Sequence, residues 1–242
     1  KFIVDLEKTS NDTYLKIFDA NIVNSNVKPK NFDVLDNKIK LFLDHEKFDF
    51  TLGFQSFEDL RLKNSDRYQY VLPYYNFNKN LSNYFNHGSI SLNSNGTNEL
   101  KNTNNLKTRV INDLSYKGKD FVTDLGFKNN FNINFKNLNS VGKNDTEYKS
   151  SPQVELMSNF EILTSLPLIK KEKDFQNYFT PKLSLNYNPG DMKDYSSSSE
   201  KKINIDNIFS NNRLGIIDSF ESGTSLTVGI DYKKEKLKDI NK

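Results

Sequence analysis

Apolar and polar residues alternate along several stretches of the chain, most clearly in residues 48–55. The apolar positions are Phe48, Phe50, Leu52 and Phe54, and the polar or small positions are Asp49, Thr51, Gly53 and Gln55. A period of two places successive side chains on opposite faces of a strand, so this stretch predicts a strand with one apolar side. Residues 39–43 alternate similarly, and residues 44–47 (DHEK) form a polar turn between the two stretches. Together they predict an antiparallel hairpin.

The same alternation returns in residues 225–232. Leu226, Val228, Ile230 and Tyr232 alternate there with Ser225, Thr227, Gly229 and Asp231. Less regular stretches are residues 2–8, 14–24, 68–79, 86–93, 105–116, 121–136, 152–165, 178–188 and 202–209. None shows the sustained i, i+3, i+4 apolar spacing of an amphipathic helix. We therefore predict an all-β chain, an antiparallel meander of about a dozen strands with few or no helices.

The composition supports the same fold class. The 242 residues include 19 Phe and 12 Tyr but only one alanine, Ala20. Alanine is the best helix former, whereas aromatic and β-branched residues suit the pleated, half-buried surface of a sheet.

The predicted connections between strands carry a second signal. Residues 93–104, 139–151 and 188–202 are long, polar and rich in Asn, Ser and Gly. Unstructured loops of this length are uncommon in compact soluble domains. Short turns combined with long polar loops are typical of a transmembrane β-barrel, whose strands cross the hydrocarbon with roughly 9 to 11 tilted residues.

Alternation alone does not say which face of the sheet is buried. In a soluble β-sandwich the apolar faces meet inside, whereas in an outer-membrane barrel they meet lipid and the polar faces line a wet lumen. The mean hydropathy of −0.72 is polar for a membrane protein, although long loops and a polar lumen lower the average. Aromatic residues near predicted strand ends, such as Tyr68, Tyr75 and Tyr178, favour the barrel because they fit interfacial girdles.

Candidate chemistry is sparse. The chain has no cysteine, and His45 and His87 lack a second ligand at helical spacing, so we predict no disulfide and no metal site. It contains no phosphate-binding loop, zinc-protease motif or nucleophile elbow. The net charge is +3, from 34 basic and 31 acidic residues, which gives no strong field for a polyanion. We therefore predict no enzyme activity, no cofactor and no nucleic-acid partner.

Four motifs in order along the chain point to a known family. Residues 209–232 read FSNNRLGIIDSFESGTSLTVGIDY, residues 180–182 read TPK, residues 71–73 read VLP and residues 12–15 read DTYL. The set resembles motifs of the lipopolysaccharide-assembly outer-membrane proteins, the LptD family, and the first stretch is similar to that family's C-terminal half. The positions that carry the resemblance include Thr180, Pro181, Asn212, Arg213 and Asp218.

This resemblance implies a transmembrane β-barrel in the outer membrane of a Gram-negative cell, with a role in lipopolysaccharide transport. It also implies the partners: lipopolysaccharide, outer-membrane lipids, a plug lipoprotein of the LptE type and a periplasmic transport bridge. A glycan needs a wide, hydrated, polar wall. The residues expected to supply it from the lumen-facing side are Asp49, Thr51, Gln55, Ser225, Thr227 and Asp231. Arg213 and Asp218 are candidates for a lumenal ion pair or for a pair that stabilises a turn.

The extent of the chain adds one expectation. About a dozen strands make roughly half of the barrel that the resemblance implies, so residues 1–242 are expected to be one partial barrel domain without the family's N-terminal jelly-roll. Lys1 follows no signal peptide and Lys242 is not the usual terminal aromatic, which agrees with a segment of a longer barrel. The alternatives are a porin or receptor-type barrel that closes on these strands, and a soluble secreted β-sandwich that binds its ligands through loops.

Overall fold

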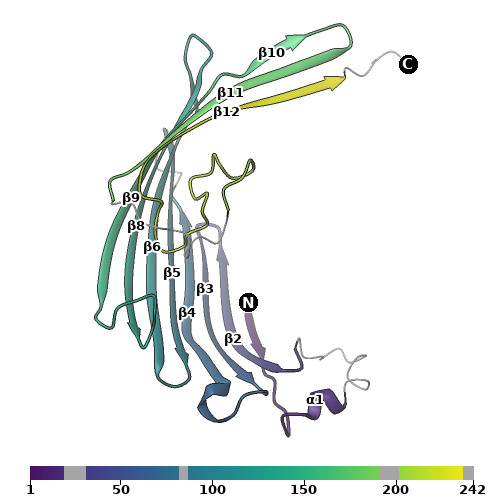
Figure 1. Ribbon diagram of the computed structural model, residues 1–242, viewed down its shortest axis with the longest axis vertical. Coiled ribbons are helices and arrows are strands. Elements are labelled where there is room, and N and C mark those ends of the chain that lie inside the picture. The colour runs from purple at the N-terminus through teal and green to yellow at the C-terminus, as the bar shows by residue number, and fades with distance from the viewer. Residues whose placement is uncertain (19–30, 82–86, 191–201, 237–242) are drawn as a thin grey trace. The chain divides into compact units, whose positions relative to one another are not determined.

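The computed structural model describes residues 1–18, 31–81, 87–190 and 202–236, and its regular structure is almost entirely strand (Figure 1). The strands are β1 (Phe2–Asp5), β2 (Val34–His45), β3 (Phe48–Asp59), β4 (Tyr68–Asn80), β5 (Gly88–Lys101), β6 (Asn105–Gly118), β7 (Phe121–Val122), β8 (Lys128–Lys143), β9 (Gln153–Ser165), β10 (Leu168–Lys171), β11 (Phe175–Asn188) and β12 (Gly223–Lys236). The described helical turns are α1 (Tyr14–Ile17) and the 3-10 turn η1 (Asn64–Arg67).

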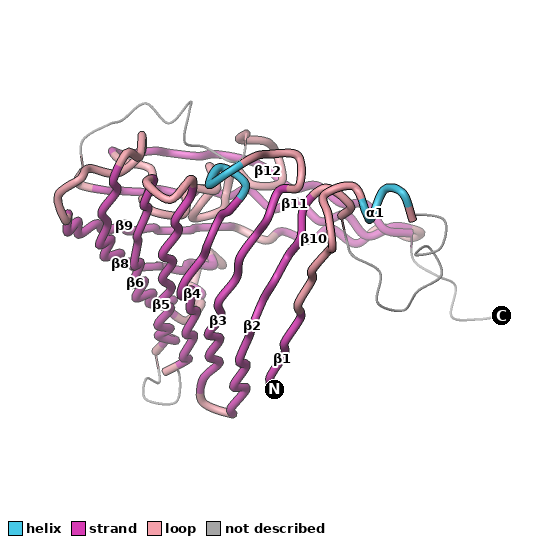
Figure 2. The backbone as a smooth tube through the Cα atoms, turned by 90° about the horizontal axis from the view of Figure 1, so that it is seen from below, coloured by secondary structure: helices cyan, strands magenta, loops and turns pink. Residues whose placement is uncertain are grey.

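Strands that follow one another in the sequence are neighbours in one twelve-stranded sheet (Figure 2). The order is β1-β2-β3-β4-β5-β6-β8-β9-β11-β10, with β12 on β11 and β7 on β8. Strands β2 and β3 pair from Val34 with Asp59 to His45 with Phe48, which confirms the predicted hairpin and leaves a two-residue turn. Among the described residues the order has two ends and the sheet does not close. The predicted all-β antiparallel meander, open like an incomplete barrel, is confirmed.

The residues divide into two compact units, which we describe separately. The first comprises residues 1–80, 92–112 and 137–155, and the second comprises residues 81–91, 113–136 and 156–242. The first unit contains a small apolar cluster of Leu15, Leu35 and Leu60, with Phe32 packed against it. This cluster holds the segment around α1 against the ends of β2 and β3.

The main property of the sheet is an inverted burial pattern, which is clear on β8 and β12 of the second unit. On β8, Asn134 and Lys136 are 7% and 6% exposed, whereas the alternating Phe135 is 48% exposed. On β12, Thr227 is 5% exposed, whereas Val228 is 71% exposed. A soluble sandwich would bury the apolar residues. The structure instead covers the polar face, which is the arrangement expected of a barrel wall.

Two predicted strands are turns in the structure. Residues 14–24 were expected to be a strand, but Tyr14–Ile17 form α1, which places Leu15 in the apolar cluster, and residues 19–24 lie outside the described residues. Residues 202–209 were also expected to be a strand, but they form turns. The side-chain oxygen of Asn204 accepts hydrogen bonds from the backbone N–H groups of Asp206 (2.9 Å) and Asn207 (3.2 Å). Asparagine favours such local turns over an extended strand.

Two predicted loops are largely strand. Most of residues 93–104 belongs to β5, which ends at Lys101, and residues 139–143 belong to β8. Residues 188–202 include Asn188 of β11 and a segment outside the described residues. Polar composition was misleading here, because side chains such as Ser94 and Asn98 bond to neighbouring strands. A strand that is paired on both sides needs little apolar surface of its own.

A glycine inside β3 is matched to an aromatic ring on β4. Gly53 is paired with Tyr74, and a Cβ atom built at Gly53 would lie 2.1 Å from the ring carbon that carries the Tyr74 hydroxyl. The strand pairing shifts register between Gly53 and Gln55, next to the VLP motif of β4. An aromatic ring that covers a strand glycine restores the packing that the missing side chain would have provided.

The exposed apolar face predicts that the protein requires an amphiphile to stay folded and dispersed. In detergent micelles we expect a monodisperse β-rich species, and in plain buffer we expect aggregation, because the exposed Leu, Val, Ile and Phe side chains would face water. Circular dichroism combined with light scattering in the two media tests this. A monomer that melts cooperatively in plain buffer would contradict the prediction.

The contact between Gly53 and Tyr74 predicts a destabilised Gly53→Ala variant. The added methyl group overlaps the ring of Tyr74, and overpacking of this kind costs about 1–3 kcal/mol. Urea unfolding in micelles, followed by tyrosine fluorescence, measures the change in the free energy of unfolding. Gly190→Ala is the control, because its nearest neighbour is the movable side-chain oxygen of Asn188 at 3.3 Å. Equal stability of the two variants would refute this account of Gly53.

Candidate functional site

The polar face of β8, β9, β11 and β12 in the second unit is the candidate functional surface. A segment between β11 and β12, residues 202–222, lies against this face, and we call it the covering segment (Figure 1). Two of its backbone oxygens accept hydrogen bonds from side chains on different strands. The Lys136 ammonium of β8 donates to the backbone oxygen of Ile217 (2.8 Å), and the Asn188 amide of β11 donates to the backbone oxygen of Glu221 (3.1 Å).

Further contacts place the covering segment on β9 and β12. The side-chain amide of Asn159 donates to that of Asn211. The ring of Phe209 lies over Gly229 of β12, where a built Cβ atom would approach the ring to 2.8 Å. The guanidinium of Arg213 donates to the hydroxyl of Thr227 (3.4 Å). The segment therefore contacts strands on both sides of β11 and covers their polar side chains.

Inside the covering segment, one asparagine holds a tight turn. The side chain of Asn212 donates to the backbone oxygen of Ile216 (2.7 Å) and accepts from its backbone N–H (3.0 Å). Gly215 in this turn has a φ of +71°, a conformation that glycine adopts without strain. The side chain of Asn212 thus closes the turn through two hydrogen bonds to Ile216.

Arg213 forms a two-pronged ion pair with Glu221 across the covering segment. Its Nε donates to Oε2 of Glu221 at 2.7 Å, and its Nη2 donates to Oε1. This fork geometry makes the pair stronger and more directional than a single contact. The sequence suggested Asp218 as the partner of Arg213, whereas in the structure Arg213 forms this ion pair with Glu221, three residues further along. The difference arises because the turn at Asn212 turns the chain back towards Arg213.

Two buried ionisable side chains of the strands also have partners, Lys136 an ion pair and Glu161 hydrogen bonds. Lys136 pairs with Asp113 of β6 at 2.7 Å. Glu161 of β9 is 3% exposed and accepts hydrogen bonds from Asn132 (2.6 Å) and Ser184 (3.4 Å). Buried charges without such partners would be costly. Sequence reasoning missed these residues, although the alternation of Phe131, Ile133 and Phe135 with polar residues already placed Lys136 on the polar face.

The residues expected to face a lumen are distributed over both units. In the second unit, Ser225 and Thr227 lie next to the covering segment, and Asp231 pairs with Lys182 of β11. Thr180 and Pro181 lie opposite Asp231 and Ile230 in the pairing of β11 with β12. In the first unit, Gln55 donates to Asp36 (2.7 Å), Thr51 lies opposite Asn76 and Asp49 lies opposite Asn78. The six residues expected to face a lumen each occupy the polar side of their strand, as does Thr180, whereas Pro181 lies on the apolar side with Ile230.

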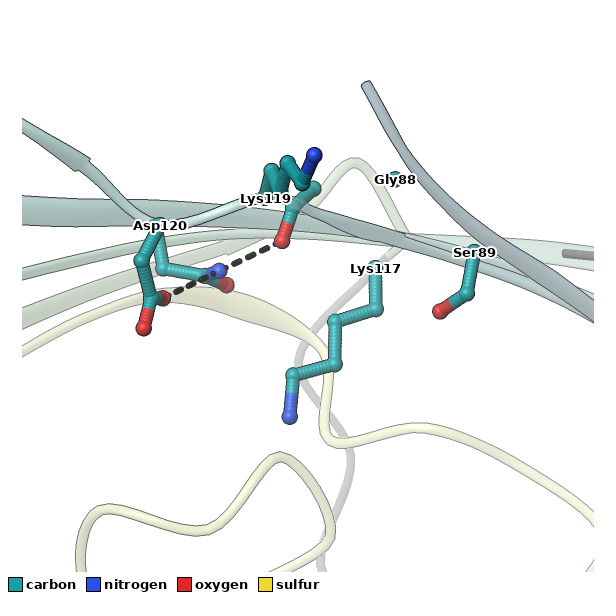
Figure 3. Close-up of a pocket in the computed structure, with 7 residues that line it drawn as sticks. Gly88, Ser89, Lys117, Lys119 and Asp120 are labelled. Carbon is teal, nitrogen blue, oxygen red and sulfur yellow. Dashed lines mark hydrogen bonds between the residues drawn. The ribbon is translucent and has the colours of Figure 1, made fainter. Parts of the chain in front are cut away.

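An open hollow of about 510 Å³ lies where β5 begins and β6 ends in the second unit (Figure 3). Lys117 and Ser89 point to the same side of it, and Asn130 bridges the backbone oxygen of Gly118 (2.6 Å) and the carboxylate of Asp120 (2.9 Å). The Lys128 ammonium lowers the pKa of Asp120 below its ordinary value, so this carboxylate is charged at neutral pH. The hollow is polar and open to solvent.

The described residues of the polar face form a hydrogen-bonded surface. Among them no three His, Cys, Asp or Glu side chains gather closely enough to hold a metal ion. No described helix has the length and apolar character needed to cross a membrane. What the site offers is a polar surface organised by amides, hydroxyls and compensated charges.

The buried Lys136 predicts a weakened contact of the covering segment in Lys136→Met. The substitution removes the partner of Asp113 and the donor to Ile217, and leaving such groups unsatisfied costs about 1–3 kcal/mol. We expect faster proteolytic cleavage within residues 202–222 of the protein in micelles. Lys128→Met on the same strand is the control, because both members of its ion pair with Asp120 are about half exposed, and solvent screening leaves such surface pairs with little effect on stability. Equal cleavage rates would contradict the anchoring role of Lys136.

Comparison with known proteins identifies the family of the chain. A search of the curated proteins finds no match to the chain. The family model described as LPS transport system D, LptD, matches residues 1–236, which is nearly the whole chain. The match agrees with the open antiparallel sheet, its covered polar face and its exposed apolar face. The chain belongs to the LptD family of lipopolysaccharide transport proteins.

Proposed function

We propose that residues 1–242 form part of the wall of an outer-membrane β-barrel that inserts lipopolysaccharide into the outer leaflet. The observation that carries the proposal is the inverted burial, with polar side chains covered and apolar side chains exposed. Membership of the LptD family supplies the substrate class. The proposed role is transport and not catalysis.

The two chemical halves of lipopolysaccharide match the two faces of such a wall. The glycan is large and hydrated, so it requires a polar surface with many donors and acceptors. The polar face offers amides, hydroxyls and paired charges, including Gln55 with Asp36 and Asp231 with Lys182. Acyl chains are apolar and would follow the outer face, where Leu52, Val228 and similar side chains meet lipid.

In this proposal the covering segment narrows the passage for the glycan. It is held by polar contacts, through Lys136, Asn159 and Asn188, and not by an extended apolar core. Polar contacts can exchange with water or with sugar hydroxyls at small net cost. The segment can therefore give way as substrate passes, while the strands behind it stay paired.

The proposed partners follow from the family and the location. The complete barrel would receive lipopolysaccharide from a periplasmic transport bridge, hold a plug lipoprotein of the LptE type and contact outer-membrane lipids. The residues proposed to line its lumen are Asp49, Thr51, Gln55, Ser225, Thr227 and Asp231. Arg213, Asn212, Thr180, Pro181 and Asp218 are proposed as structural residues of the wall and of the segment that covers it.

Photocrosslinking in cells tests the proposed transport. A photoreactive amino acid is placed at Thr51 and Asp231 on the polar side, and at their neighbours Leu52 and Ile230 on the apolar side. We expect crosslinks to lipopolysaccharide from the polar set that disappear when the transport bridge is deprived of ATP. The same probe at Thr227 is an internal control, since this buried residue should crosslink to the covering segment.

Other outcomes would separate the alternatives. Polar positions that never crosslink to lipopolysaccharide in a membrane-embedded protein would indicate a porin or receptor-type barrel. Absence of lipid crosslinks from Leu52 and Ile230 would refute the membrane location itself.

A further inference from the structure

Three strands of the second unit form a ribbon that continues past the end of β9. Strand β10 pairs with the first part of β11, and the last part of β12 pairs with the other side of β11 (Figure 1). Residues paired across these strands project to the same side of the sheet. One such row, which we call the aromatic row, consists of Leu168, Phe179 and Tyr232. Two positions further along lies a second row, which we call the lysine row and which consists of Lys170, Asn177 and Lys234.

Both rows lie on the apolar side of the sheet. On β12, Val228 and Ile230 are 71% and 61% exposed, and Tyr232 and Lys234 follow them at the same spacing of two residues. The residues of β11 that lie opposite Val228 and Ile230 are also apolar. The outward side of the ribbon therefore changes along the strands from aliphatic to aromatic residues and then to basic ones.

Tyr232 is oriented as expected at a boundary between hydrocarbon and water. Its hydroxyl donates to the side-chain oxygen of Asn177 in the lysine row (2.9 Å), and the residue is 62% exposed beside Phe179. Tyrosine gathers at membrane interfaces because its ring is apolar and its hydroxyl needs a polar partner. The aromatic row therefore fits the edge of the hydrocarbon.

The strands have a suitable length on the other side of the aromatic row. Phe179–Asn188 of β11 and Gly223–Tyr232 of β12 each contain ten residues. A tilted strand crosses the hydrocarbon in roughly 9 to 11 residues. The outward positions of these stretches are mainly apolar and include Leu185, Leu226 and Val228. With one edge of the hydrocarbon at the aromatic row, both strands are long enough to reach the other edge.

The lysines of the lysine row are accessible from outside. The Lys234 ammonium lies 4.3 Å from the centroid of the Phe175 ring, which keeps this side chain on the outward side. The Lys170 side chain is 79% exposed, and its pair with Glu172 at 3.2 Å is a surface contact. Surface ion pairs are weak because solvent screens them, so the Lys170 ammonium remains available to another anion.

The ribbon as a whole is basic. Residues 168–177 and 232–236 together contain six lysines and three acidic residues. One of the acids, Glu235, pairs with Lys233 on the opposite, polar side of the ribbon, so it does not neutralise the outward side. A basic patch next to an apolar, lipid-facing surface attracts anionic headgroups.

The connections of β11 indicate which leaflet the lysine row faces. Residues 172–174 join β10 to β11, whereas residues 189–222 join β11 to β12 at the opposite end of β11. Outer-membrane barrels have short turns on the periplasmic side and longer loops on the outside. The lysine row is at the end with the short turn, which is therefore the periplasmic end, where the leaflet consists of phospholipids.

We propose that the lysine row binds the phosphate groups of anionic phospholipids in the periplasmic leaflet. The aromatic row lies at the edge of the hydrocarbon, and Lys170, Lys234 and the neighbouring Lys236 contact the headgroups beyond it. A lysine close to an anionic membrane surface raises the affinity for that surface about fivefold. The inference rests on the proposed membrane location, and it adds a lipid-binding contact to it.

Tryptophan fluorescence in bilayers tests this contact, because the chain has no native tryptophan. Phe179→Trp places one reporter in the aromatic row, next to the lysine row. Phosphatidylglycerol or phosphatidylcholine with brominated acyl chains, which quench tryptophan on contact, is mixed with the other lipid in unlabelled form. We expect a several-fold preference of the reporter site for phosphatidylglycerol. In the double variant Lys170→Gln/Lys234→Gln we expect the preference to disappear, so that the two lipids quench equally.

The matched control is the double variant Lys171→Gln/Lys233→Gln with the same reporter. It removes the same charge from the same two strands, but these lysines pair with Gln176 and Tyr178 on the polar side of the ribbon. We expect this variant to keep the preference for phosphatidylglycerol. An equal loss in both double variants would overturn the proposal, since only the total charge would then matter. A reporter without any preference in the parent protein would overturn it as well.

A second reporter separates this inference from the proposed function. Val228→Trp lies in the aliphatic part of the outward side, so brominated acyl chains should quench it strongly. Absence of quenching there would refute the membrane location and the proposed function with it. Strong quenching at Val228→Trp, combined with no lipid preference at Phe179→Trp, would refute only the phospholipid contact.

Cysteine labelling in cells tests the assigned leaflet. Lys173→Cys introduces a cysteine into the turn between β10 and β11 of a chain that has none. A maleimide too large to cross the outer membrane should react with it only after that membrane has been permeabilised. Reaction in intact cells would overturn the assignment, because the lysine row would then face the phosphates of lipopolysaccharide in the outer leaflet.

Discussion

The sorting of side chains between the two faces of the sheet is the constraint on which the rest of the structure depends. Strand pairing satisfies the backbone N–H and carbonyl groups, so each residue's environment is decided mainly by its face. Here the covered face carries asparagine, serine, threonine and charged residues, and the exposed face carries phenylalanine, leucine, isoleucine and valine. Such a sheet is favourable only where its exposed side meets an apolar medium. Membership of the LptD family agrees with this physical requirement.

The covered face remains stable because its charges are compensated locally. Lys136 is held between Asp113 and the backbone oxygen of Ile217, and Arg213 is held by Glu221. The wall and the covering segment therefore depend on each other: the segment supplies acceptors to the wall, and the wall supplies donors that position the segment. A surface built in this way is ordered and still compatible with water, which a passage for a hydrated glycan requires.

Glycine and aromatic residues add a second kind of complementarity. Glycine normally weakens a strand, yet Gly53, Gly96 and Gly229 each lie beneath an aromatic ring, from Tyr74, Tyr75 and Phe209 respectively. The first two pairs join neighbouring strands, and the third joins a strand to the covering segment. Because a built Cβ atom would overlap each ring, these glycines are required by close approach of the partner ring and not by backbone conformation.

The sequence by itself determined the elements whose alternation is regular, because a period of two is a local property. The hairpin of β2 with β3 and the strand β12 are of this kind, and the motifs at residues 12–15, 71–73, 180–182 and 209–232 were sufficient to indicate the family. Strand β5 was only partly predicted, because its polar composition resembles that of a loop and its stability comes from β4 and β6. The one-turn helix α1 was not predicted for a related reason, because Leu15 packs against residues that are distant in the sequence.

Only the tertiary structure decided that the polar face is the covered one, that Glu221 pairs with Arg213 and that Asp113 pairs with Lys136. Burial and ion pairing depend on which distant segments of the chain come into contact. The alternation of residues along one strand does not contain that information.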